Sequence, residues 1–132
     1  YIYQRSTKGY CDIDMWNLYH FYGELFSSSI KEFKDNLHGY PLGMTEEEWD
    51  EYLEKMSRLF YNITHEEEVY KNPYWDLYCY KVFENKENKN IPAIKELYEK
   101  FLETKEENKK KIERDKNEAF KMLSDRFFDL WD

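Results

Sequence analysis

The residues that could carry chemistry are three histidines, two runs of glutamates and one run of serines, and none of them matches a catalytic pattern. His20 and Glu24 lie one helical turn apart, but a metal site needs three or four ligands. The glutamates at 46–48 and 66–68 are typical of solvated helix starts, and the serines at 27–29 lack the glycine-rich turn of a nucleophile. The sequence therefore predicts a protein that is not an enzyme and has no metal and no cofactor.

Aromatic side chains are more informative, because they make up 20% of the residues and tyrosine outnumbers phenylalanine. Tyrosine tolerates a partly wetted ring, so this excess favours a binding surface. Rings beside cations suit a nucleotide, and tyrosine and tryptophan also dominate protein interfaces. In the alternative reading these rings are ordinary core and packing residues. The candidate ligand- or partner-binding residues are Arg5, Lys8, Tyr10, Trp16, Tyr19, His20, His38, Tyr40 and Trp49.

The formal net charge of −8 argues against nucleic-acid binding through a basic face. It leaves simple solubility, a basic protein partner, or mimicry of nucleic acid. No apolar run has the length of a membrane span, and no signal peptide is recognisable. The two cysteines, Cys11 and Cys79, are far apart, which favours free thiols in a reducing compartment. We therefore expect a cytoplasmic protein that does not contact a membrane.

The length of 132 residues predicts a single domain covering residues 1–132. Residues 1–11 show no helical period and are expected to form an extended arm. Asp12 is typical of a helix N-cap, and apolar residues at spacings of three and four predict a helix over about 13–37. Gly39 is expected in the left-handed conformation that follows this helix. Its apolar face comprises Met15, Leu18, Tyr22, Leu25, Phe26, Ile30, Phe33 and Leu37.

The later elements begin at clear start signals. Thr45 and Glu48 form a capping box, which predicts a helix to about residue 63. Asn72 and Pro73 open a third, shorter helix to about 83, although the alternation over 78–82 also suits a strand. Residues 84–91 are expected to form an exposed loop.

Residues 92–131 have an apolar patch at each end. The charged stretch 103–111 between the two patches has no glycine or proline. It favours one long helix over two. The sequence thus predicts an all-α fold. The expected architecture is a small helical bundle of about four helices, with an N-terminal antiparallel hairpin and a long C-terminal helix.

Several short strings resemble a family of small acidic proteins of tailed bacteriophages and prophages whose function is unknown. The strings are 9–16 (GYCDIDMW), 33–34, 38–41 (HGYP), 45–50 (TEEEWD), 55–56 and 128–132 (FDLWD). The resemblance covers the first half of the chain and its last dozen residues, but not the stretch from about 64 to 118.

Small acidic phage proteins often antagonise host defence, and the resemblance loosely implies this class of function for the chain. Two hypotheses follow from it. In one, the protein binds a host defence protein complex. In the other, it sequesters a nucleotide second messenger. A virion structural or assembly protein is the alternative.

The final residues predict self-association. Phe127, Phe128 and Trp131 place aromatic rings on more than one side of the last helix, and a small bundle can cover only one such side. A twofold homodimer would bury the remaining rings. Residues 1–3 of the same chain are the other candidate cover.

Overall fold

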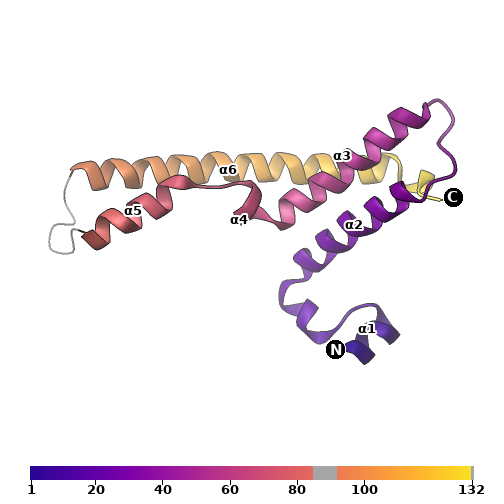
Figure 1. Ribbon diagram of the computed structural model, residues 1–132, viewed down its shortest axis with the longest axis horizontal. Coiled ribbons are helices and arrows are strands. Elements are labelled where there is room, and N and C mark those ends of the chain that lie inside the picture. Colours follow the sequence, from indigo (N-terminus) through magenta and orange to yellow (C-terminus); the bar gives the residue numbers. More distant parts are fainter. Residues whose placement is uncertain (85–91, 132) are drawn as a thin grey trace. The chain divides into compact units, whose positions relative to one another are not determined.

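The computed structural model describes residues 1–84 and 92–131, and no strand occurs among them. The predicted all-α fold is therefore confirmed, including its long C-terminal helix (Figure 1). Contacts divide the chain into two compact units, Tyr1–His65 with Asp115–Asp132, and Glu66–Arg114. The prediction of a single domain does not anticipate this division. The exposed loop predicted at 84–91 lies outside the described residues except for Glu84, which ends a helix.

The first unit is organised by a hairpin of two helices, α2 (Leu18–Asp35) and α3 (Glu46–Thr64). Three contacts fix their antiparallel pairing. Gly23 faces Thr64, the Ser57 hydroxyl donates to the Ser27 carbonyl at 2.8 Å, and Lys34 pairs with Glu54 at 3.4 Å. The N-terminal antiparallel hairpin expected from the sequence is thus present.

The core of this unit lies where the hairpin meets the C-terminal end of α6 (Pro92–Asp125). Trp49, Leu53, Met56 and Phe60 on α3 are fully buried, and Ala119 and Met122 on α6 pack against them. The Tyr52 hydroxyl donates to the carbonyl of Met122 at 2.6 Å, and burial raises the pKa of this phenol. Both apolar contacts and a hydrogen bond therefore join α3 to α6.

Only half of the apolar face predicted for the first helix is in the core. Phe26, Ile30, Phe33 and Leu37 pack there, because this part of α2 runs beside α3. The exposed members of the face are Met15, Leu18, Tyr22 and Leu25. The first three precede Gly23, which lies level with the end of α3 at Thr64, so α3 does not reach them. Leu25 follows Gly23 and is exposed as well, so the end of α3 does not account for it.

The start of the chain differs from the prediction. Residues 1–11 are not an extended arm: Ile2–Lys8 form a helix, α1, which Gly9 ends at φ +82°. Asp12 does not cap the following helix, because its carboxylate accepts from Gln4 on α1 at 2.6 Å. Asp14 instead accepts from the Cys11 amide at 2.8 Å, and Asp12–Asn17 form a 3₁₀ helix, η1, before α2 begins. The predicted helix 13–37 is thus two elements.

The turn between α2 and α3 also differs in detail. α2 ends at Asp35, four residues before Gly39, and the Asn36 side chain donates to the Glu32 carbonyl at 2.8 Å. Gly39 is not in the left-handed region. That conformation belongs to Gly43 at φ +86°, in the turn closed by the Met44 amide and the Pro41 carbonyl. The positive φ is needed by the tight turn and not by the end of the helix.

The second unit consists of α4 (Glu66–Val69), α5 (Pro73–Glu84) and the first part of α6. The start of α5 is as predicted, because the Tyr74 amide donates to the Asn72 side chain at 3.3 Å, and the alternative strand over 78–82 is wrong. Aromatic pairs join α5 to α6, with Trp75 and Phe101 at 4.9 Å and Tyr78 and Tyr98 at 5.2 Å between ring centroids.

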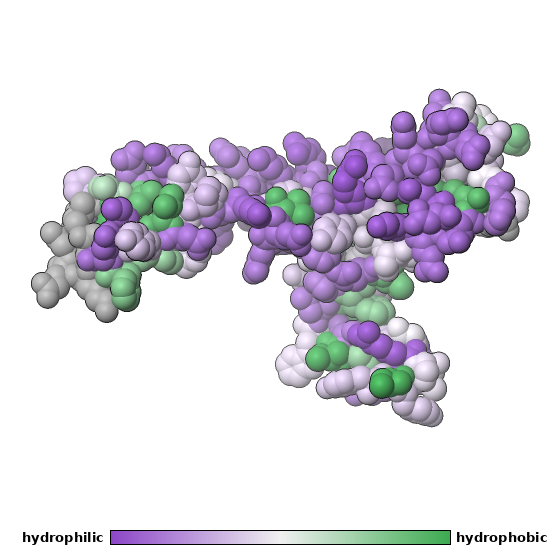
Figure 2. Space-filling model, viewed as in Figure 1, coloured by the Kyte–Doolittle hydropathy of each residue, from purple (hydrophilic) through white to green (hydrophobic). Residues whose placement is uncertain are grey.

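One continuous helix, α6, spans the charged stretch, so the prediction of one helix over two is confirmed. It ends at Asp125 rather than near Trp131, and Phe127–Asp129 form a short 3₁₀ helix, η2. Figure 2 shows mostly hydrophilic atoms along the upper edge of the molecule, where α6 runs in Figure 1.

The capping box at the start of α3 gives a direct test of the fold. The Glu48 amide donates to Thr45 Oγ1 at 3.1 Å, and the Thr45 amide donates to Glu48 Oε2 at 3.0 Å. Thr45→Ala should lower the free energy of unfolding by about 1 kcal/mol, measured by chemical denaturation. Thr45→Ser keeps the oxygen and is the control. An equal loss in both variants would contradict the capping role.

The closest approach of α2 and α3 gives a second test. A Cβ placed on Gly23 would lie 1.8 Å from Thr64 Cγ2. Gly23→Ala should therefore destabilise the protein by about 1–3 kcal/mol through overpacking, although helix propensity alone favours alanine by about 1 kcal/mol. Thr64→Ser removes the clashing methyl group, so the loss should shrink by at least about half in that background. A stabilised Gly23→Ala variant would show that the helices do not meet there.

Candidate protein-binding groove

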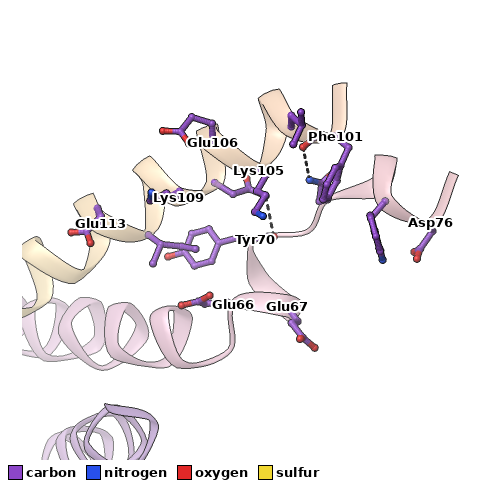
Figure 3. Close-up of a pocket in the computed structure, with 14 residues that line it drawn as sticks. Glu66, Glu67, Tyr70, Asp76, Phe101, Lys105, Glu106, Lys109 and Glu113 are labelled. Atoms are coloured by element: carbon purple, nitrogen blue, oxygen red, sulfur yellow. Dashed lines mark hydrogen bonds between the residues drawn. The ribbon is translucent and has the colours of Figure 1, made fainter. Parts of the chain in front are cut away.

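A groove of about 1250 Å³ lies within the second unit, between α6 and the chain from α4 to the start of α5. Figure 3 shows the ring of Tyr70 lying across the space between α4 and α6. The groove exceeds the usual 300–1,000 Å³ of a small-molecule site. Its lining residues are Glu66, Glu67, Tyr70, Asn72, Trp75, Asp76, Phe101, Leu102, Lys105, Glu106, Asn108, Lys109, Ile112 and Glu113.

Two asparagine side chains hold the connecting segment 70–72 against α6. Asn108 on α6 donates to the carbonyls of Tyr70 and Lys71 at 3.1 and 3.2 Å. In the opposite direction, Asn72 donates to the carbonyl of Phe101 at 3.0 Å. The two bonds from Asn108 satisfy carbonyls that lie outside the helices, so this wall of the groove is braced without a ligand.

Aromatic and aliphatic side chains form the apolar part of the groove. Trp75 is 48% exposed although it contacts Phe101, so one side of the indole remains open to solvent. Tyr70 and Ile112 line the other end. An exposed aromatic ring held by a rigid neighbour is a common anchor in protein interfaces.

The charged groups of the groove are mostly acidic. Five carboxylates line it (Glu66, Glu67, Asp76, Glu106 and Glu113), against the ammonium groups of Lys105 and Lys109. Figure 3 places Glu66 and Glu113 near the Tyr70 end, Asp76 beyond Phe101, and the two lysines between. The excess negative charge favours a cationic ligand and disfavours phosphate groups.

The residues proposed from the sequence lie elsewhere, all in the first unit. Trp49 is 1% exposed and belongs to the core, where it stacks on Tyr52, so it cannot line a ligand site. Trp16 is 90% exposed on η1. Also exposed are Lys8 on α1, Tyr10 between α1 and η1, Tyr19 on α2, and His38 and Tyr40 in the α2–α3 turn. Their role in binding a ligand or partner stays a prediction.

Arg5 forms an ion pair and a hydrogen bond within the N-terminal part of the chain. Its Nη2 lies 2.7 Å from Asp14 Oδ1, and its Nε donates to Cys11 Sγ at 3.4 Å. The hydrogen bond with Cys11 and the charge of Asp14 raise the pKa of the guanidinium. The Cys11 amide and thiol, followed by the charge of Arg5, hold the pKa of Asp14 below its usual range. Arg5 therefore serves to fasten α1 to η1 and is poorly placed to meet a phosphate.

His20 belongs to a polar cluster at the end of the α2–α3 hairpin. Glu24 Oε1 lies 2.9 Å from His65 Nε2 and 4.0 Å from His20 Nε2. The His65 ring stacks on Tyr61, with 3.9 Å between centroids, and its Nδ1 lies 2.8 Å from the Tyr61 carbonyl. Within residues 1–84 and 92–131, no group of three histidine, cysteine or acidic residues could hold a metal ion. The cluster therefore connects α2 to the C-terminal end of α3.

The terminal aromatics are exposed, as the self-association hypothesis requires. Phe127, Phe128 and Trp131 are 57, 89 and 75% exposed. They do not lie on one helix, because α6 ends at Asp125, and Phe127 and Phe128 form an edge-to-face pair at 5.5 Å. The homodimer stays a prediction. Both cysteines are free, as expected, but only Cys11 is buried.

Comparison with known proteins gives no family for this chain. No family model matches it, and neither a curated protein nor a solved structure is significantly similar. None of the described helices is long and apolar enough to cross a membrane. The resemblance to phage proteins accordingly remains a hypothesis.

Sequence reasoning missed the groove because its residues come from two separate stretches of the chain, 66–76 and 101–113. Glu66 and Glu67 read as an ordinary solvated run, and Asn108 sits in a stretch of alternating charges. The one available signal was Asn108 itself, an uncharged residue in the middle of that stretch. Nothing in its spacing identifies the carbonyls that it binds.

The bracing role of Asn108 gives a test of the groove wall. Asn108→Ala removes two hydrogen bonds worth about 1 kcal/mol each, so segment 70–72 should open more often. Limited trypsin cleavage after Lys71 should become roughly ten- to thirtyfold faster, because a loss of about 2 kcal/mol makes opening that much more frequent. Asn117→Ala, an exposed site on α6 in the first unit, is the control. Equal cleavage rates in the two variants would show that Asn108 does not hold the wall.

Proposed function

We propose that this chain is a non-enzymatic binding protein whose groove engages a protein partner that carries basic and apolar side chains. The observation that supports this proposal is the composition of the groove. Aromatic residues held in place by α6 alternate with carboxylates that outnumber the lysines by five to two. Protein interfaces commonly combine aromatic anchors with a charged rim of this kind.

The same composition argues against the nucleotide hypothesis for this groove. A nucleotide brings phosphates, which would meet an excess of negative charge. Arg5, one of the two cations just before the aromatics Tyr10 and Trp16, is already paired with Asp14. The groove is also larger than a site for one small molecule usually is. A macromolecular segment fits these properties better.

The resemblance to small acidic phage proteins gives a first class of partner to test, which is a host defence protein. The strings that carry the resemblance all lie in the first unit, Tyr1–His65 with Asp115–Asp132. The unmatched stretch, from about 64 to 118, nearly coincides with the second unit, Glu66–Arg114. On this proposal the first unit is a shared scaffold, and the second unit carries the surface that selects the target.

The proposal is tested by capturing a partner from a lysate of a host bacterium with the tagged chain. The captured protein is identified by mass spectrometry, purified, and rebound to the variants. Glu66→Lys with Glu67→Lys should weaken binding roughly tenfold or more, because it places two cations where the partner's cations bind.

The matched control is Glu46→Lys with Glu47→Lys, which changes the same residue type in the first turn of α3 by the same charge. It should bind like the unmodified protein. Trp16→Ala tests the N-terminal aromatics in the same assay. Thermal unfolding verifies each fold, and Glu66→Gln with Glu67→Gln is the milder substitute. Failure to capture any partner, or a partner lost only with Trp16→Ala, would overturn the proposal.

A further inference from the structure

The groove presents side chains and almost no backbone to a ligand. Its walls are helices, whose amides and carbonyls are paired internally, and the described residues contain no strand edge. The carbonyls of Tyr70 and Lys71, which lie outside the helices, already accept from Asn108. An extended peptide would find no ladder of hydrogen bonds here. A helical segment satisfies its own backbone and needs only side-chain contacts.

The length of the groove along α6 fits such a segment. Its apolar contacts run from Phe101 to Ile112 on one continuous helix. At a rise of about 1.5 Å per residue, this distance is about 17 Å, which is three turns of a partner helix. Leu102, Lys105, Lys109 and Ile112 line the groove and are spaced by three, four and three residues, so they follow one stripe of α6. This stripe lies beside the position where Asn108 holds the segment 70–72. A second helix of about twelve residues can lie along this stripe.

The charges are arranged along the same direction. One end combines Tyr70 and Ile112 with the carboxylates of Glu66 and Glu113, and the other end combines Trp75 with Asp76. Lys105, Glu106 and Lys109 occupy the middle, where two ammonium groups against one carboxylate disfavour another cation. A complementary helix therefore has an apolar face for the aromatics and places its basic residues near its two ends.

We infer that the occupant of the groove is a basic amphipathic α-helix of a partner protein, about three turns long, with lysine or arginine near both ends. This inference rests on the proposed function, because it specifies the partner of the same groove. It adds the conformation of the bound segment and the placement of its charges.

The test uses a synthetic peptide of about fifteen residues with leucine at helical spacing, lysines near both ends, and glutamine and alanine in the middle. Such a short peptide is mostly unfolded in water, so binding to the full chain should add helical signal in circular dichroism. Calorimetry gives the affinity. Glu66→Gln with Glu67→Gln should weaken binding roughly three- to tenfold at low salt, and Glu46→Gln with Glu47→Gln should not change it.

Two control peptides sharpen the outcome. A central proline prevents the helix, and glutamates in place of the lysines reverse the charge. Both should bind at least roughly tenfold more weakly than the parent peptide. Equal binding of the proline peptide, or binding without a gain of helix, overturns the inference.

The failures of the two proposals can be told apart. A captured partner that depends on Glu66 and Glu67, together with no peptide binding, overturns the helix and leaves the protein-binding function standing. Failure to capture a partner overturns the function itself. The oligomeric state of the chain alone is measured by sedimentation. A dimer that dissociates when Glu66→Lys and Glu67→Lys are introduced would show that a second copy of the chain occupies the groove. That result would overturn the inference.

Discussion

The continuity of α6 is the constraint on which the rest of the structure depends. Its first part supplies Phe101 and Asn108 to the second unit, and its last part supplies Ala119 and Met122 to the core of the first. The helix therefore has to persist through a stretch that contributes little apolar burial. Helix-forming residues with opposite charges at helical spacing, such as Glu106 and Lys110, favour the helix where packing is sparse. Neither unit could form as described if this helix broke.

Local signals predicted the helices well, because each signal acts on backbone groups only a few residues away. The capping box at Thr45, the Asn72–Pro73 start and the absence of helix breakers in α6 all had their expected effect. The errors occurred where a longer-range contact competes. Asp12 is a good cap by composition, but its carboxylate is engaged by Gln4 on α1. Met15, Leu18 and Tyr22, on the apolar face predicted for the first helix, are exposed because α3 ends at Thr64, level with Gly23.

The candidate site was less predictable than the fold. The aromatic residues chosen from the sequence were grouped because they are close to one another in the sequence. The groove, in contrast, is formed by residues that are up to 47 positions apart (66 to 113). Trp49 and Trp16 illustrate the difficulty, since the same residue type is 1% exposed in one place and 90% exposed in the other. Composition indicated that some rings face solvent, but only tertiary structure separates the anchors of a surface from the members of a core.

The second unit is a single uninterrupted segment, Glu66–Arg114, which leaves and rejoins the first unit at two points of the chain. In chain order the second unit is therefore an insertion between two parts of the first. The segment that carries the groove could be lengthened, shortened or replaced while the core residues of the first unit stay the same. The helix imposes one rule on these exchanges. Residues gained or lost within α6 must preserve its rotational phase, so changes of about seven or eleven residues are tolerated better than changes of two or five.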